Sequence, residues 1–235
     1  MNIILLTSED WLNNRVVRLT DRRHEHIKTI LKSVVGDTLR VGLWGGDRGA
    51  GVVAKTTSSC TELEITLSDP PLPRHPFDIA LGLPRPKMLR RVLRTAAEMG
   101  VANLHLIHSA RVEKSFWQSP LLHESRITAA LQAGMERSGD TTPPTVHLHR
   151  LFRPFVEDHL PGLIGERAGW LADPGADQPL NPSREPGLIL LGPEGGFVPF
   201  EIALAQSVGV TAGHLGTRVL SVDTALAATL SQALG

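Results

Sequence analysis

From residue 77 onward, short apolar runs alternate with segments of helical periodicity, and few folds can accommodate this pattern. The apolar runs predict strands at 77–83, 102–107, 145–149, 169–172, 188–191 and near 214–215. The periodic segments predict a helix that begins at Pro86 and further helices at 125–137, 200–208 and 224–234. Strands that alternate with helices form a parallel sheet covered on both faces, so we expect an α/β domain over residues 73–235.

Residues 1–72 show a different pattern. Short apolar runs at 38–44, 51–55 and 63–67 are separated by glycine-rich turns, and a helical segment spans 24–32. These features predict a small β-barrel. The proline-rich stretch 69–76 disfavours both a helix and a central strand, so we interpret it as a linker between a domain at 1–72 and a domain at 73–235.

The net charge of zero conceals an uneven distribution. The chain has 24 basic and 24 acidic side chains, but residues 73–155 hold twelve basic and six acidic ones, whereas residues 156–235 hold three and nine. Because exposed charges are screened over roughly 8 Å at physiological salt, the acidic end does not cancel a distant basic patch. The basic excess is concentrated between Arg85 and Arg94, which favours contact with a polyanion as much as a solvated helix face.

Composition excludes several classes of protein. Cys60 is the only cysteine, so we expect no internal disulfide, no cysteine-based zinc site and a cytoplasmic location. No apolar run approaches the roughly 20 residues of a membrane span. His147 and His149 alternate on one predicted strand, but they lack a third ligand at suitable spacing, so we expect no metal.

Two glycine-containing loops follow predicted strands near the C-terminus. The first continues the apolar run 188–191 as Gly192-Pro193-Glu194-Gly195-Gly196, and the second is Leu215-Gly216-Thr217-Arg218-Val219-Leu220. Ligands of open α/β sheets bind at the carboxyl ends of strands, and glycines let a ligand approach the backbone. Neither loop is a Walker loop or a G-x-G-x-x-G motif, and a single such loop is also typical of a plain strand-to-helix turn.

Taken together, these loops and the alanine-rich helix after Ser221-Val222-Asp223-Thr224-Ala225 resemble the SPOUT superfamily of methyltransferases. More narrowly, they are similar to the RsmE-type 16S rRNA (uracil-N3) methyltransferases. His26 to Lys32 with Val35-Gly36-Asp37, and Glu98-Met99-Gly100-Val101, also match signatures of that family, so the resemblance spans almost the whole chain.

The resemblance implies a PUA-like β-barrel followed by a trefoil-knotted parallel-sheet domain. It further implies S-adenosylmethionine as cofactor, ribosomal RNA or the small ribosomal subunit as partner, a homodimer, and no need of a metal. The cofactor-binding residues carried over from the family are Leu191, Gly192, Pro193, Glu194, Gly195, Gly196, Leu215, Gly216, Val219, Leu220, Thr224 and Ala225. The residues expected to bind RNA are Lys32, Arg85, Lys87, Arg90, Arg91 and Arg94.

Two charged residues have candidate roles in such a site. A cation near the uracil oxygens favours the deprotonated base, so Arg218 is the candidate catalytic residue, with a phosphate or carboxylate clamp as the equal alternative. Glu194 is expected to accept backbone N–H groups within its loop rather than to act as a general base. A side chain at Gly195, as in Gly195→Val, is expected to block the cofactor directly.

Several polar positions depart from the family pattern. Asp140 replaces an arginine, Ser221 an arginine and Asp223 a glutamate. These differences leave two alternatives open: a divergent paralogue that acts on another RNA, and a non-catalytic RNA-binding or ribosome-assembly protein that retains the fold.

Overall fold

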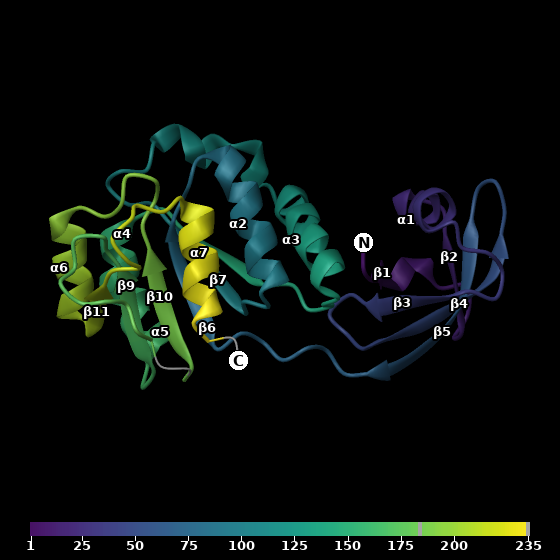
Figure 1. Ribbon diagram of the computed structural model, residues 1–235. Coiled ribbons are helices and arrows are strands. Elements are labelled where there is room, and N and C mark those ends of the chain that lie inside the picture. Colours follow the sequence, from purple (N-terminus) through teal and green to yellow (C-terminus); the bar gives the residue numbers. More distant parts are fainter. Residues whose placement is uncertain (183–184, 234–235) are drawn as a thin grey trace. The chain divides into compact units, whose positions relative to one another are not determined.

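The computed structural model describes residues 1–182 and 185–233 (Figure 1). The chain divides into two compact units. The first contains Met1–Pro73 and Met135–Pro143, and the second contains Arg74–Gly134 and Pro144–Gly235. The expected division at residue 72 therefore omits one segment, because Met135–Pro143 groups with the N-terminal part.

The first unit is a five-stranded sheet with short helices. The strand order is β1-β3-β4-β5-β2, with β1 parallel to β3 and the other pairs antiparallel. The strands are β1 (Ile4–Leu6), β2 (Val16–Leu19), β3 (Thr38–Leu43), β4 (Arg48–Thr56) and β5 (Thr61–Asp69). The helical elements are the 3₁₀ turn η1 (Ser8–Asp10), α1 (Arg22–Glu25) and the π-helix η2 (His26–Leu31). A compact apolar core fills this unit, so it can bury its own sheet face.

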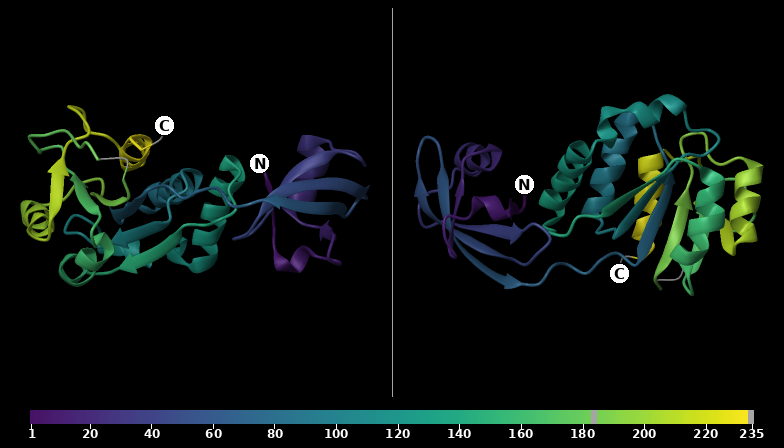
Figure 2. Two further views of the ribbon diagram at one scale, coloured as in Figure 1. Left: turned by 90° about the horizontal axis from the view of Figure 1, so that it is seen from below. Right: turned by 180° about the vertical axis from the view of Figure 1, so that it is seen from behind.

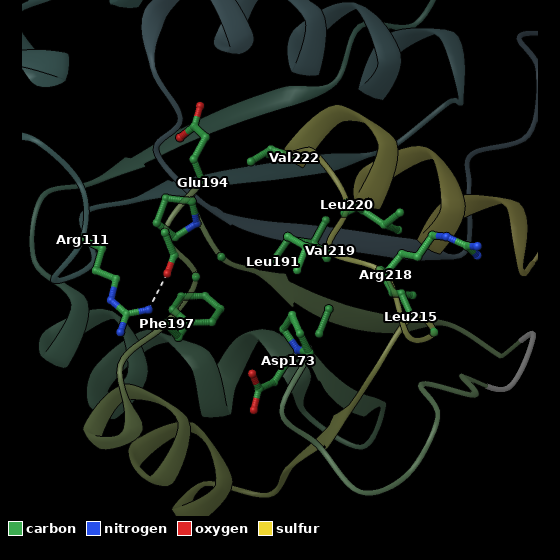
Figure 3. A pocket seen from close by; sticks show the side chains of 18 residues that line it. Arg111, Asp173, Leu191, Glu194, Phe197, Leu215, Arg218, Val219, Leu220 and Val222 are labelled. Carbon is green, nitrogen blue, oxygen red and sulfur yellow. Dashed lines mark hydrogen bonds between the residues drawn. The ribbon is translucent and has the colours of Figure 1, made fainter.

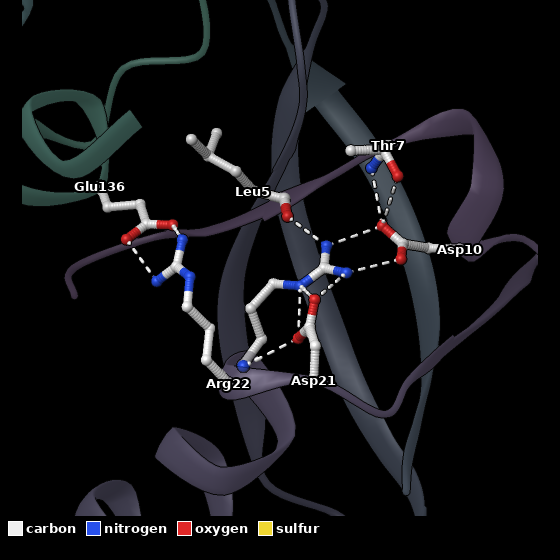
Figure 4. A network of polar contacts seen from close by, with 7 residues as sticks. Leu5, Thr7, Asp10, Asp21, Arg22 and Glu136 are labelled. Atoms are coloured by element: carbon white, nitrogen blue, oxygen red, sulfur yellow. Dashed lines mark hydrogen bonds and ion pairs between the residues drawn. The ribbon is translucent and has the colours of Figure 1, made fainter. Parts of the chain in front are cut away.

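A buried arginine organises the polar contacts of the first unit (Figure 4). The guanidinium of Arg23 donates to both carboxylate oxygens of Asp10, at 2.6 and 2.7 Å, and to the carbonyl of Leu5. Its Nε donates to Asp21, which also caps α1 by accepting from the Arg23 backbone N–H. Burial of Asp21 opposes its ionisation, but the hydrogen bonds from Arg23 outweigh that effect and lower the pKa of Asp21.

The segment Met135–Pro143 is attached to the first unit by hydrogen bonds and an ion pair. The Asn2 backbone N–H donates to the Glu136 carbonyl at 2.6 Å, and Gly45 donates to the Thr141 carbonyl at 2.8 Å. The Glu136 carboxylate accepts two hydrogen bonds from Arg22. Asp140 is buried and accepts from the backbone N–H groups of Thr141 and Thr142. Asp140 is therefore a turn-forming residue in this chain.

The second unit contains a six-stranded, entirely parallel sheet, as the alternation of strands and helices predicted. Its order is β11-β9-β10-β6-β7-β8. The strands are β6 (Phe77–Gly82), β7 (Asn103–Ile107), β8 (Thr145–His149), β9 (Ala168–Ala172), β10 (Gly187–Leu191) and β11 (Val210–Gly213). The helical elements are α2 (Pro86–Glu98), η3 (Lys114–Gln118), η4 (Pro120–Leu122), α3 (Glu124–Ser138), α4 (Phe152–Pro154), η5 (Phe155–His159), α5 (Leu160–Ile164), α6 (Pro199–Ser207) and α7 (Val222–Ser231).

Helices cover both faces of this sheet (Figure 2). Leu188 and Leu190 of β10 pack in one apolar cluster with residues of α4, η5, α5 and α6. Because side chains alternate along a strand, Ile189 and Leu191 face the opposite side, where α7 contacts both β10 and α2. β10 is therefore buried on both faces, which explains its uninterrupted apolar sequence.

The structure differs from the predicted elements at several places, beginning with β1 and β2 of the first unit, which were not among the predicted strands. The strand predicted near 214–215 lies earlier, as β11, because Val210 is the buried residue that packs against α6 and the sheet. The helical segment from 152 to 164 was not predicted because Pro154 and Pro161 interrupt its pattern. The last helix begins at Val222, two residues earlier than predicted, and Leu234, its predicted end, lies outside the described residues.

Candidate functional site

A pocket of about 340 Å³ opens where β9, β10 and β11 end (Figure 3). Its volume lies near the lower end of the range typical of small-molecule sites. The lining residues come from the connections after these three strands, from the start of α7 and from the connection after β7. They are Arg111, Ala172, Asp173, Pro174, Leu191, Gly192, Pro193, Glu194, Gly195, Gly196, Phe197, Leu215, Gly216, Arg218, Val219, Leu220, Val222 and Ala225.

Close backbone packing shapes the first loop. A Cβ atom at Gly192 would lie 2.8 Å from the Gly196 Cα, so only glycine fits there. A Cβ atom at Gly82, at the end of β6, would lie 2.7 Å from the backbone nitrogen of Pro193. The Gly196 N–H donates to the Pro193 carbonyl at 2.8 Å, and Gly196 has a left-handed φ of +70°. The glycines of this loop thus permit a tight turn against β6.

Two arginines contact the first loop from neighbouring connections. The Glu194 carboxylate accepts from the Arg85 backbone N–H at 3.2 Å and lies 3.5 Å from its Nε. Glu194 therefore accepts a backbone N–H as expected, but from the start of α2 rather than from its own loop. Arg111 donates from Nη1 to the Gly195 carbonyl. A Cβ atom at Gly195 would lie 3.0 Å from the Arg111 Cδ, so a side chain there would meet Arg111 first.

The second loop is more exposed than the first. Gly216 has a left-handed φ of +111°, and no atom lies within 4 Å of a Cβ built there. Val219 is 84% exposed although it lines the pocket. The Arg218 side chain is also exposed, and in Figure 3 its guanidinium points away from Leu191. This loop therefore offers apolar side chains and a cation at the outer rim.

Ser221 and Asp223 form a polar cluster at the start of α7. The Ser221 hydroxyl donates to the Asp223 carboxylate at 2.6 Å, and Arg91 of α2 donates to the same carboxylate at 3.3 Å. The hydrogen bond from Ser221 is the main reason why the pKa of Asp223 is lowered, and the bond from Arg91 adds to it. The two substituted family positions thus contact each other and α2.

The structure brings most predicted site residues together. Arg218 and eleven of the twelve residues predicted to bind the cofactor line this one pocket. Thr224 does not, because it lies on the exposed side of α7 and its hydroxyl is 2.9 Å from the Ser221 hydroxyl. The residues that sequence reasoning missed are Arg111, Ala172, Asp173, Pro174, Phe197 and Val222. The rule that sites lie at strand ends could have indicated Asp173, which directly follows β9.

The cations predicted to bind RNA are exposed. Arg85 immediately precedes α2, and four cations lie on the outer face of this helix: Lys87, Arg90, Arg91 and Arg94. The opposite face is buried and carries Met88, Leu89, Val92 and Leu93. Arg85 and Arg91 pair with Glu194 and Asp223. Among the described residues, Lys87, Arg90 and Arg94 have no acidic partner. Lys32 belongs to the first unit, where it is exposed and ends η2 in a left-handed conformation.

Four histidines lie together beside β7 and β8. His105 stacks on His147 with ring centroids 4.5 Å apart, and its Nδ1 lies 3.1 Å from the His149 Nε2. His159 contacts His149. Burial, reinforced by the neighbouring imidazoles, lowers the pKa of His105 to about 4. No group of residues arranged to hold a metal ion occurs within residues 1–182 and 185–233. Over the same ranges, no helix is sufficiently long and apolar to cross a bilayer.

Residues 70–234 match the family described as RNA methyltransferase domain. The chain belongs to this family. The match covers the parallel sheet and the pocket residues, so it confirms the family type that the two loops predicted.

Two curated proteins named ribosomal RNA small subunit methyltransferase E are similar to this chain. The protein from Treponema pallidum is 28% identical over 97% of this chain and 88% of its own length. The protein from Synechocystis is 26% identical over 97% of this chain and 76% of its own length. The predicted resemblance to RsmE-type enzymes is thereby confirmed.

A solved structure shares the fold. The Neisseria gonorrhoeae ribosomal RNA small subunit methyltransferase E, crystallised with S-adenosyl methionine, is 20% identical and superposes with a TM-score of 0.77. The superposition covers 98% of this chain and 95% of that one. The α/β fold of this chain, from its first to its second unit, is therefore the fold of that protein.

Proposed function

We propose that this protein transfers the methyl group of S-adenosylmethionine to N3 of a uridine in 16S ribosomal RNA. The observation that carries the proposal is the pocket at the ends of β9, β10 and β11, which gathers eleven predicted cofactor-binding residues in a chain of the RNA methyltransferase domain family. The names of the similar proteins supply the ribosomal RNA of the small subunit as substrate.

The pocket suits an adenosyl cofactor in size and chemistry. Leu191, Leu215 and Leu220 offer apolar contacts, and the glycines of the first loop carry no side chain that would keep a ligand away from the backbone. At Gly216 no atom lies within 4 Å of a Cβ position, so a ligand can approach this backbone closely. The structural relative crystallised with S-adenosyl methionine supports the same choice.

The reaction places modest demands on the protein. The cofactor supplies a methyl group already activated on a sulfonium, so the chain must mainly position the two reactants, which can contribute roughly 7–11 kcal/mol in favourable cases. The loop residues Leu191 to Gly196 would hold the cofactor. Arg218, exposed at the outer rim, would lie near the uracil oxygens and stabilise the base once N3 has lost its proton. A clamp on a phosphate or carboxylate remains its alternative role.

The proposal includes finer features of the fold. We propose that the first unit is a PUA-like barrel that binds RNA and that the C-terminal chain is knotted. Support for the knot comes from the connection between β9 and β10: Leu180 donates to the His214 carbonyl, and His214 donates to the Gln178 carbonyl. In the sheet, β9 lies between β11 and β10. After β11, the chain contacts the β9–β10 connection at His214 and then continues into α7, which packs on β10 and α2.

A homodimer in the cytoplasm completes the proposal. The homodimer is carried over from the resemblance of the two pocket loops to the SPOUT superfamily, and Val219, 84% exposed at the pocket rim, is a residue that a second copy would cover. Sedimentation velocity at micromolar protein tests this part. The proposal expects a species of twice the chain mass, and a monomer throughout would contradict it.

Isothermal titration calorimetry with S-adenosylmethionine tests the cofactor assignment. The proposal expects saturable binding of one cofactor per chain. Absence of binding by the folded protein would overturn it.

The second candidate is a non-catalytic RNA-binding or ribosome-assembly protein. The observation that favours it is the polar cluster at Ser221 and Asp223. The Asp223 carboxylate accepts hydrogen bonds from Ser221 and Arg91 within the protein, so these bonds must break before it can bind a substrate. A divergent paralogue that methylates another RNA would carry the same cluster. Methylation of a uridine other than one in 16S ribosomal RNA would favour the paralogue, and RNA binding without any methylation would favour the non-catalytic protein.

A further inference from the structure

Arg111 contacts the first pocket loop from a connection that the proposed function does not use. It follows β7 in the chain, lies 84 residues before Gly195 and donates from Nη1 to the Gly195 carbonyl. Figure 3 shows its guanidinium directed toward this loop beside Phe197. The aliphatic part of the side chain lies against Gly195, since a Cβ there would be 3.0 Å from Cδ and 3.2 Å from Cβ of Arg111.

The backbone next to Arg111 is fixed by a buried carboxylate. Glu201, in the first turn of α6, is 3% exposed. One of its oxygens accepts from the Ala110 N–H at 2.7 Å, and the other accepts from the Val198 N–H at 3.0 Å. The side chain of Arg111 therefore starts from a backbone that is tied to the far end of the same loop.

The loop needs an external contact of this kind. Gly195 and Gly196 are consecutive, and glycine loses more conformational freedom on ordering than any other residue. The peptide unit between them is planar, so its carbonyl and its N–H point in opposite directions. Arg111 binds the carbonyl, and the N–H donates to Pro193 at 2.8 Å. The carbonyl and the N–H of this peptide are thus both hydrogen-bonded, and these two bonds fix the orientation of the turn.

We infer that Arg111 is a positioning residue, which holds the Gly195–Gly196 peptide in the orientation that receives the cofactor. The inference rests on the proposed function, since it assigns the loop to cofactor binding. In the absence of Arg111, the loop samples other peptide orientations, and binding must first select the competent one. The chemical step itself does not involve Arg111.

Four variants test this role. Arg111→Ala is expected to weaken the Kd for S-adenosylmethionine roughly tenfold, because a hydrogen bond from a charged donor orders the free loop. At saturating cofactor its kcat is expected to stay within about twofold of the wild type, since only binding is affected. Arg111→Lys retains one charged donor for the carbonyl and is expected to recover most of the affinity.

The third variant combines Arg111→Ala with Gly195→Ala. It removes the contact from Arg111 and instead restricts the backbone of residue 195, because alanine has fewer accessible conformations than glycine. The φ of Gly195 is not left-handed, so alanine can adopt it, and truncation of Arg111 to alanine removes the closest contact, with Cδ at 3.0 Å. The Cβ of residue 111 remains 3.2 Å from the new methyl group, so the two segments must separate by a few tenths of an ångström. We expect the double variant to bind the cofactor more tightly than Arg111→Ala alone. Gly195→Ala alone, with Arg111 in place, is expected to bind more weakly than the wild type.

The outcomes separate this inference from the proposed function. If the wild-type protein binds no S-adenosylmethionine, the proposed function is wrong. If the wild type binds and Arg111→Ala has an unchanged Kd, or a reduced kcat at saturating cofactor, the positioning role is wrong while the function stands. Equal affinities of the Arg111→Ala and Arg111→Lys variants would also overturn it, because a general packing role needs no charged donor.

Discussion

Single residues of the pocket are constrained mainly by backbone proximity. Gly192 is the clearest case, because a Cβ there would lie 2.8 Å from the Gly196 Cα and 3.1 Å from its carbonyl carbon, and neither backbone atom can move aside cheaply. We expect Gly192→Ala to displace the loop and weaken S-adenosylmethionine binding at least about tenfold, which corresponds to about 1.4 kcal/mol. Calorimetric titration checks this.

The matched control is Gly162→Ala. Gly162 lies in α5, and no atom lies within 4 Å of a Cβ built there. This variant should bind the cofactor as the wild type does and should be slightly more stable, since alanine favours a helix. Equal cofactor affinity of the Gly192→Ala and wild-type proteins would show that the loop does not hold the ligand.

At the same scale, the buried arginine of the first unit should govern its stability. Arg23→Met leaves Asp10, which is 9% exposed, without its cation, and loss of one partner of a buried pair costs about 3–5 kcal/mol. Arg18→Met breaks an ion pair whose arginine side chain is 47% exposed, and should cost at most about 1 kcal/mol. Urea unfolding compares the two, and similar losses would contradict this view of Arg23.

Among the elements, α2 is the candidate surface for RNA. Lys87, Arg90 and Arg94 are its exposed cations without an acidic partner among the described residues. If they contact phosphates, replacement of all three by glutamine should flatten the dependence of log affinity on log salt concentration by roughly 2–3 units. Binding of a 16S ribosomal RNA fragment over a salt series measures this slope.

Arg153→Gln is the control for that series. Arg153 is an exposed cation of the same unit. It lies in α4 and forms an ion pair with Glu157 of η5. Its replacement should leave the slope unchanged. If the triple variant retains the wild-type slope, the charges of α2 are a solvated face and bind no phosphate.

His105 of β7, which lies against two histidines of β8, should make the free energy of unfolding depend on pH. The pKa of His105 is about 4 in the folded protein, against an ordinary value of about 6.5 in the unfolded chain. Below pH 6.5 the unfolded state therefore binds a proton that the folded state does not. The free energy of unfolding should fall by roughly 2 kcal/mol as the pH drops from 7 to 4.5.

Urea unfolding at several pH values checks this dependence. The variant His105→Gln removes the titrating group, and its stability should fall less steeply over the same range. An identical pH dependence of both proteins would show that other groups cause the loss.

For the whole molecule, the parallel sheet and most of the pocket could be predicted because each produces a pattern in neighbouring residues of the sequence. The apolar run before Gly192 and the glycines after it reflect burial and close backbone approach at adjacent positions. The roles of Arg111 and Glu201 could not be predicted from a local pattern, because their hydrogen bonds join segments far apart in the chain. Met135–Pro143 was missed for the same reason, since its partners Asn2 and Gly45 lie in another part of the sequence.

Mapping of modified nucleotides in the ribosomal RNA of a strain that lacks this gene tests the proposed methyl transfer most directly. Mass spectrometry of small-subunit RNA should show the loss of one N3-methyluridine. The wild-type gene should restore it, and variants with Gly192→Ala or Arg218→Ala should restore it poorly. An unchanged set of methylated uridines in the deletion strain would contradict the central claim.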